Sequence, residues 1–208
     1  MSTIEGQRRQ ISRHRPLHIY REDMFYFVTC STRGKKTFLD TEAKRDLLRD
    51  VLKEKTKNLG VRLTAWVILK NHYHLLFHVP SKETLASFMR QINGRSSYEI
   101  NRLDGIRGRS IWYNYWDRCP RNERDFYSFF NYIHINPLKH GDVHFPESVL
   151  QIQGENWRLN ADRTVNFHEM LAQYPYSSYP FYLRKYGGPA LTHVWMDYPI
   201  PVDLEGME

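Results

Sequence analysis

The sequence has few cysteines and no long apolar run, and both shortages limit what the protein can be. Cys30 and Cys119 are the only cysteines among 208 residues, and they do not have the spacing of a metal-binding pair. Two isolated cysteines predict reduced thiols and a cytoplasmic protein. The apolar runs are only a few residues long, and residues 1–15 lack the apolar segment of a secretory signal. We therefore expect neither a membrane-spanning helix nor secretion.

The composition is that of a folded protein with surplus positive charge. Hydrophobic residues make up 41% and charged residues 25%, which is ordinary for one globular domain and excludes a disordered chain. The net charge of +7 favours a polyanionic partner. The 14 tyrosines and 5 tryptophans could stack on unpaired bases or fill the core. The composition thus favours single-stranded nucleic acid without requiring it.

Apolar periodicity predicts seven helices and strands. β-Branched and aromatic runs predict strands, and apolar residues at helical spacing predict helices. The order is strand, helix, strand, strand, helix, strand, helix, over residues 24–31, 42–57, 61–69, 72–79, 82–103, 111–118 and 123–136. This order predicts a ferredoxin-like α+β sandwich, with a mainly antiparallel sheet and helices on one face.

Two residues are expected to disturb the helices. Gly94 weakens the middle of the helix over 82–103. The helix that Asn122 caps is expected to end at Pro137, because proline disfavours helical conformation in the residue before it. The exact direction of the Asn136 side chain is therefore open.

The predicted organisation is one domain with an extension at each end. Residues 1–20 form a polar, basic arm, which is either a solvated tail or a segment that lies on a phosphate backbone. Residues 21–145 form the main domain. Residues 146–208 are predicted to be a loop-rich C-terminal extension that packs on the same domain.

His72 and His74 form the strongest local pattern. Residues i and i+2 of a strand point to the same face, so these two imidazoles lie side by side while Tyr73 points away. Two imidazoles at this spacing can share a metal ion. A pair on a half-exposed strand can also be chemically idle, so the pattern alone leaves both interpretations open.

Tyr132 and Asn136 form a second pattern on the last predicted helix. They are four residues apart and share one face, beside an apolar stripe that faces the core. The pair could direct a phenol and an amide along the sheet surface. Taken alone, the pattern also fits a boundary tyrosine that packs its ring and leaves its hydroxyl solvated.

Five segments occur in an order that resembles a known family. They are FYFVTCSTR, AWVILKNHYHLLFHV, SIWYNYWDR, NYIHINPLKHG and YPYSSY, within residues 24–180. The combination resembles the single-tyrosine HUH transposases, most closely the REP-associated tyrosine transposases. The resemblance implies that His72 and His74 are metal ligands, that Tyr132 is the nucleophile, and that Asn136 is a further ligand or an orienting group.

The chain departs from the family pattern in two ways. The family often has Trp-Gln where this chain has Trp112 and Tyr113. The chain is also rich in other tyrosines, so Tyr127 and Tyr98 are alternative nucleophiles.

The resemblance also implies an activity, a cofactor and a partner. The activity is cleavage and strand transfer on single-stranded DNA with imperfect hairpins, through a covalent 5′-phosphotyrosine, with Mg²⁺ or Mn²⁺. A homodimer is left open. Basic and aromatic residues could contact the DNA, although half of an alternating strand must face the core. These candidates are Arg8, Arg9, Arg107, Arg109, Trp112, Tyr113, Tyr115 and Trp116.

Three other interpretations are open. The first is an inactive relative that binds hairpin DNA or RNA without cutting it. The second is a replication or conjugation nickase of the HUH class, which often has two tyrosines on the active helix. The third is an unrelated His-x-His metal hydrolase, which would stay active after Tyr132→Phe substitution.

Overall fold

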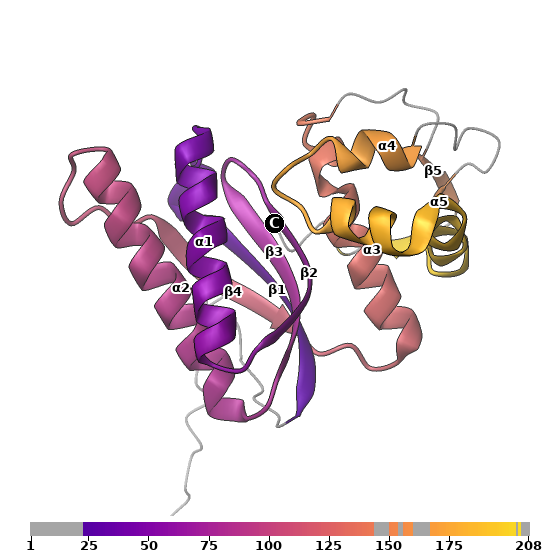
Figure 1. Ribbon diagram of the computed structural model, residues 1–208, viewed down its shortest axis with the longest axis horizontal. Coiled ribbons are helices and arrows are strands. Elements are labelled where there is room, and N and C mark those ends of the chain that lie inside the picture. Colours follow the sequence, from indigo (N-terminus) through magenta and orange to yellow (C-terminus); the bar gives the residue numbers. More distant parts are fainter. Residues whose placement is uncertain (1–22, 144–149, 154–155, 160–166, 203, 205–208) are drawn as a thin grey trace, which may run out of the picture.

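A four-stranded antiparallel sheet forms the centre of the protein (Figure 1). The computed structural model describes residues 23–143, 150–153, 156–159, 167–202 and 204. The strands lie in the order β2-β3-β1-β4. Their bounds are β1 (Met24–Thr32), β2 (Arg62–Ile68), β3 (His72–Val79) and β4 (Trp112–Arg118). Every neighbouring pair is antiparallel, which confirms the predicted α+β class and the antiparallel sheet.

Two helices, α1 (Glu42–Asn58) and α2 (Lys82–Leu103), cover one face of the sheet (Figure 1). Phe77 of β3 packs edge-on against Phe88 of α2, with ring centroids 5.0 Å apart. Gly94 does not interrupt α2, although a glycine inside a helix costs about 1 kcal/mol relative to alanine. Burial of the apolar face of α2 against the sheet outweighs this cost.

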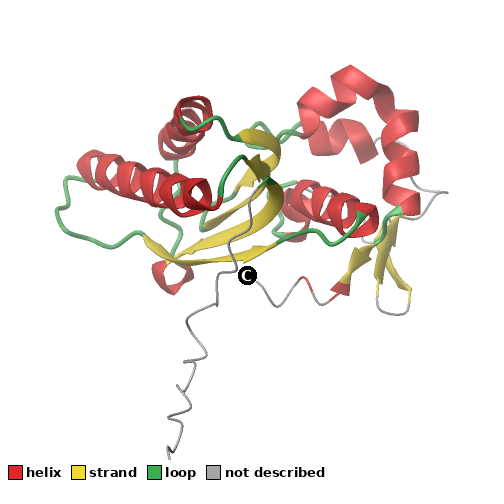
Figure 2. Ribbon diagram, turned by 90° about the horizontal axis from the view of Figure 1, so that it is seen from below, coloured by secondary structure: helices red, strands yellow, loops and turns green. Residues whose placement is uncertain are grey.

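The helix α3 (Glu123–Lys139) covers the opposite face of the sheet. Phe129 of α3 stacks on Phe27 of β1, with ring centroids 4.7 Å apart. Figures 1 and 2 show the sheet between α3 and the pair formed by α1 and α2. The prediction of helices on one face holds for α1 and α2. The third predicted helix, α3, lies on the other face instead, so β3 is enclosed between two helical layers.

The sequence predicted that α3 would end at Pro137. In the structure the helix continues past this residue to Lys139. Proline removes one backbone donor, and here the loss falls in the final turn of the helix. Later residues supply donors to this turn: the His140 N–H donates to the Asn136 carbonyl at 3.0 Å, and the Val143 N–H donates to the Pro137 carbonyl at 3.0 Å. Asn136 therefore keeps its helical position.

The prediction that the C-terminal extension is loop-rich is wrong for residues 167–172 and 179–197, which form two helices. The described C-terminal elements are β5 (Leu150–Gln153), β6 (Asn156–Leu159), α4 (Phe167–Ala172), α5 (Tyr179–Asp197) and β7 (Ile200–Pro201). The helix α5 contains Pro189 and is kinked at Gly187, where φ is 77°. These two residues obscure the helical pattern in the sequence. No helix within the described ranges is long and apolar enough to cross a membrane.

Candidate functional site

The two histidines of the predicted metal site lie on the central strand β3 and face α3. They alternate with Tyr73, whose hydroxyl donates to Asn93 Oδ1 of α2 at 2.6 Å on the other face of the sheet. The imidazole centroids of His72 and His74 are 4.9 Å apart. Their side chains are buried, with exposed fractions of 4% and 0%. The alternation of the strand thus brings the two rings together.

Neighbouring polar groups hold each imidazole at Nδ1. His72 Nδ1 lies 2.7 Å from Asn71 Oδ1. Because an amide oxygen only accepts, Nδ1 is the donor and Nε2 carries the lone pair of the neutral ring. His74 Nδ1 lies 2.8 Å from Thr29 Oγ1 of the adjacent strand β1. Metal-binding histidines are commonly oriented by a hydrogen bond at their other nitrogen, so each ring could bind an ion through Nε2 when Nδ1 carries the proton.

The helix α3 brings Tyr132 to the same place. The Tyr132 ring is fully buried and lies edge-on to His74, with ring centroids 5.3 Å apart. Phe27 of β1 also contacts the tyrosine ring edge-on, at 5.9 Å between centroids. Lys139 Nζ lies 4.7 Å from the centroid of the same ring. Tyr132 is thus held between a predicted metal ligand, the sheet and a cation.

Asn136 has a buried amide oxygen that could serve as a third metal ligand beside the two histidines. It is buried one turn after Tyr132. Its Oδ1 has no hydrogen-bond partner within the part of the chain that the structure describes. Those residues also contain no group of three or more His, Cys, Asp or Glu side chains that could hold an ion. An amide oxygen is a suitable ligand for a hard divalent cation, so two imidazoles and this oxygen fit such an ion.

The two alternative nucleophiles point elsewhere. Tyr127, near the start of α3, stacks on Tyr198 of the C-terminal segment, with ring centroids 4.6 Å apart. Tyr98 is 62% exposed on α2, which covers the sheet face away from the histidines. Among the three candidate tyrosines, Tyr132 is the one whose ring lies against His74.

A polar stripe on the back of α3 fastens this helix to the C-terminal segment. Ser128 Oγ donates to the Pro199 carbonyl at 2.9 Å, and His134 Nε2 lies 2.8 Å from Ser178 Oγ. Asn131 Nδ2 donates to two carbonyls, those of Tyr198 at 2.8 Å and Val194 at 3.0 Å. Burial lowers the pKa of His134 to about 3, so this imidazole is neutral at pH 7. The sequence reasoning missed these residues, although their spacing of three was visible on one helix face.

The aromatic side chains of β4 divide between core and surface. Trp112 is buried: its indole N–H donates to Ser96 Oγ of α2 at 2.8 Å, so in this structure it is not available to stack on a base. Tyr115 is half-buried, whereas Tyr113 and Trp116 are 40% and 38% exposed. Trp116 lies opposite Thr29 on β1, on the sheet face of the histidines.

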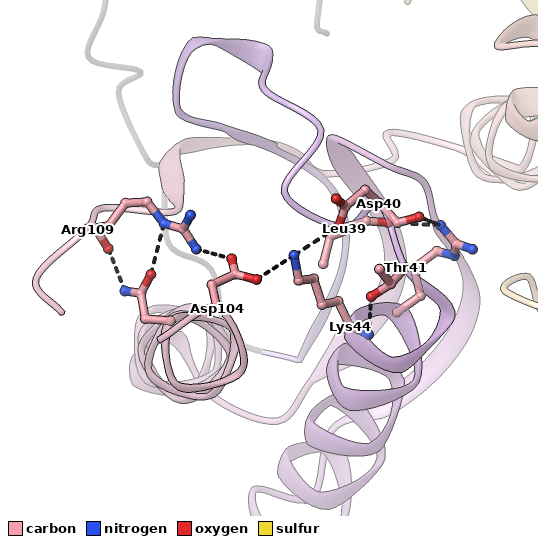
Figure 3. Close-up of polar contacts among 8 residues, drawn as sticks. Leu39, Asp40, Thr41, Lys44, Asp104 and Arg109 are labelled. Atoms are coloured by element: carbon pink, nitrogen blue, oxygen red, sulfur yellow. Dashed lines mark hydrogen bonds and ion pairs between the residues drawn. The ribbon is translucent and has the colours of Figure 1, made fainter. Parts of the chain in front are cut away.

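Arg109 is engaged in an ion-pair cluster rather than extended into solvent (Figure 3). Its guanidinium pairs with Asp104, and its Nε donates to Asn101 Oδ1 at 2.9 Å. Asp104 also pairs with Lys44 Nζ of α1 at 2.7 Å. The cluster therefore joins the end of α2 to the start of α1. Arg107 is exposed on the same loop, and Arg8 and Arg9 lie outside the described residues.

Comparison with known proteins agrees with this fold and assigns the chain to a family. The family model described as Transposase IS200 like matches residues 21–134, more than half of the chain. A REP-associated tyrosine transposase of Escherichia coli (strain K12) is 28% identical over 120 residues, which cover 57% of this chain and 68% of that protein. A solved structure of a REP-associated tyrosine transposase bound to a REP hairpin is similar in fold, with a TM-score of 0.59 and 21% identity. The structural match covers 82% of this chain and 86% of the chain in that structure. This protein belongs to the IS200-like transposase family.

Proposed function

We propose that this protein is a metal-dependent single-stranded DNA endonuclease and strand transferase with Tyr132 as its nucleophile. The observation that carries the proposal is the contact between Tyr132 of α3 and His74 of β3, with 5.3 Å between ring centroids. Asn136 offers a buried amide oxygen one turn later. In this proposal, two regular elements of the fold would hold the nucleophile and the ligands that activate the phosphate.

Tyr132 would act through its phenolic oxygen. That oxygen attacks the phosphorus of the scissile phosphodiester, and the bond from phosphorus to the 3′ oxygen breaks. The phenol proton is transferred, directly or through water, to the leaving oxygen. The products are a 5′-phosphotyrosine and a free 3′-hydroxyl. A second 3′-hydroxyl can reverse the step and join two strands without ATP, because the covalent intermediate retains the phosphodiester bond.

His72, His74 and Asn136 would hold the divalent ion, for which Mg²⁺ and Mn²⁺ are the candidates. When bound, the ion stabilises negative charge that builds on the scissile phosphate. Lys139 Nζ, 4.7 Å from the centroid of the Tyr132 ring, places a positive charge where it can stabilise negative charge on the phenol.

The proposed substrate is single-stranded DNA that carries short hairpins. The Escherichia coli relative is named a REP-associated tyrosine transposase, and the similar solved structure is bound to a REP hairpin. In this chain, Trp116 lies on the histidine face, opposite the Thr29 that contacts His74, and is partly exposed. An exposed indole at this place can stack on an unpaired base.

The test is formation of a covalent protein–DNA adduct. Labelled single-stranded hairpins from beside the protein's own gene are incubated with Mg²⁺ or Mn²⁺ and analysed on denaturing gels. We expect an adduct with the wild type and with Tyr127→Phe, and none with Tyr132→Phe, with His74→Ala or without metal. An adduct with Tyr132→Phe would assign the nucleophile elsewhere. Tight hairpin binding by the wild type without an adduct would indicate a binding protein that does not cut.

A further inference from the structure

A small pocket adjoins the histidine pair, between the turn after β1 and the end of α3. It is lined by Ser31, Lys35, Asn71, His72 and His140. Ser31, Lys35, Asn71 and His140 each have a polar side chain that can donate a hydrogen bond, and no carboxylate lines the pocket among the residues that the structure describes. The ammonium group of Lys35 adds a full positive charge. This lining favours an anion over a cation or an apolar group.

The backbone at Lys35 is held in an uncommon conformation. Lys35 ends the short helix η1 (Arg33–Lys35) with a φ of 53°, in the left-handed region that side-chain-bearing residues rarely adopt. Asn71 fixes it there: Nδ2 donates to the Lys35 carbonyl at 3.2 Å, while Oδ1 accepts from His72 Nδ1 at 2.7 Å. One side chain therefore positions both the lysine turn and a predicted metal ligand.

The opposite wall of the pocket belongs to α3, the helix that carries Tyr132. His140 follows the last turn of α3, and its backbone N–H donates to the Asn136 carbonyl at 3.0 Å. Its imidazole lies edge-on to His72, with ring centroids 4.7 Å apart. The pocket therefore has one wall beside the histidines of β3 and the other at the end of α3. It lies next to the place where the scissile phosphate would be activated.

From these contacts we propose that the pocket binds a backbone phosphate adjacent to the one that is cut, with Lys35 as its principal contact. The inference rests on the proposed function and adds to it the way in which the strand is aligned. Phosphate contacts fix the register of a strand, and an ammonium group binds phosphate through charge-assisted hydrogen bonds. Lys35 is therefore a positioning residue that sets which phosphate meets Tyr132.

The experiment combines single phosphate neutralisation with substitution of Lys35. Phosphates on either side of the cut are replaced one at a time by uncharged methylphosphonates, and single-turnover cleavage is measured with Mn²⁺. At one position we expect the wild type to slow about tenfold. The Lys35→Gln variant should be about tenfold slower on the unmodified strand and should lose nothing further at that position.

Two further variants separate charge from backbone shape. Lys35→Gly removes the ammonium group but adopts the left-handed conformation without cost, so it should behave like Lys35→Gln. Lys57→Gln removes one exposed charge at the far end of α1 and should keep the wild-type pattern. A second readout is the dependence of hairpin binding on salt concentration. The slope of log K against log salt is negative, and in Lys35→Gln its magnitude should decrease by about 0.7.

A Lys35→Gln variant that cleaves at the wild-type rate, or that still slows tenfold at the same phosphate, would overturn the proposal. If the wild type cleaves no strand at all, the proposed function fails instead. In that case the salt slopes of hairpin binding still decide the role of the pocket: a lower slope in Lys35→Gln supports a phosphate contact, and equal slopes contradict it.

Discussion

Asn136 donates a side-chain hydrogen bond to the backbone carbonyl of Tyr132, 2.6 Å away and one turn earlier in α3. This bond uses Nδ2 and fixes the rotation of the amide. The amide oxygen is left as a buried acceptor without a hydrogen-bond partner among the described residues. A burial cost of this kind is tolerated in native proteins mainly where a ligand or a function accounts for it.

Asn136→Ala should therefore weaken metal binding more than folding. We expect the affinity for Mn²⁺ to fall roughly tenfold or more, because one of three proposed ligands is removed. Asn136→Asp keeps an oxygen and adds a negative charge, so it should bind Mn²⁺ at least as tightly as Asn136→Ala does. Titration calorimetry measures both. Wild-type affinity in Asn136→Ala would exclude this side chain as a ligand.

Ser178→Ala should show whether the C-terminal segment positions α3. His134 Nε2 would lose its 2.8 Å partner inside the core, which should lower the unfolding free energy by about 1–3 kcal/mol. We expect adduct formation to slow while Mn²⁺ affinity changes little, because the two histidines are held by β3 and β1. Urea unfolding and adduct kinetics measure these effects, with Ser87→Ala in α2 as the control. Unchanged adduct kinetics in Ser178→Ala would show that this bond does not position the nucleophile.

Acid should destabilise the fold through His134. Burial lowers the pKa of His134 from 6.5 to about 3 in the folded protein. Between these values the unfolded chain binds a proton that the folded chain does not, so the unfolding free energy falls as the pH falls from 6.5 towards 3. The limit is about 1.4 kcal/mol per pH unit. In urea unfolding with a chelator present, the wild type should lose up to about 2 kcal/mol more than His134→Gln between pH 7 and pH 5. Equal losses would mean that His134 does not titrate in this way.

Two tryptophans of β4 should respond in opposite ways to substitution. Trp116→Ala should weaken binding of single-stranded DNA by about 1–3 kcal/mol through lost stacking, with little change in stability. Trp112→Phe loses the hydrogen bond to Ser96 Oγ and should lower stability by about 1 kcal/mol without weakening DNA binding. Fluorescence anisotropy and urea unfolding measure the two effects. The reverse result would show that the faces of β4 are assigned wrongly.

The four-stranded sheet and the helices α1, α2 and α3 could be predicted from sequence because each of these elements carries a sustained apolar period. The same strand alternation placed His72 and His74 together, and the spacing of four placed Tyr132 and Asn136 on one face. Their meeting across the sheet could not be derived from spacing, because it depends on α3 packing on the face opposite α1 and α2. That arrangement is set by tertiary contacts such as the stacking of Phe129 on Phe27.

Other features were hidden for local reasons. The sequence could not show which aromatic side chains of β4 point to which face of the sheet, because the pairing of β1 with β4 shifts register between Cys30 and Thr32. The helix α5 was missed because Pro189 and Gly187 interrupt its pattern. The end of α3 was placed too early because the effect of Pro137 is small in a final turn. Arg109 was predicted to contact DNA because its ion pair with Asp104 forms only when the loop folds back, and the sequence does not show this pairing.

The most direct measurement is to identify which tyrosine carries the DNA. The covalent adduct is digested with nuclease and trypsin, and the modified peptide is sequenced by mass spectrometry. Residues 125–139 form one tryptic peptide that contains both Tyr127 and Tyr132, so fragment ions must locate the added nucleotide. We expect the phosphonucleotide mass on Tyr132. The same mass on Tyr127, or on a residue outside this peptide, would contradict the assignment of the nucleophile.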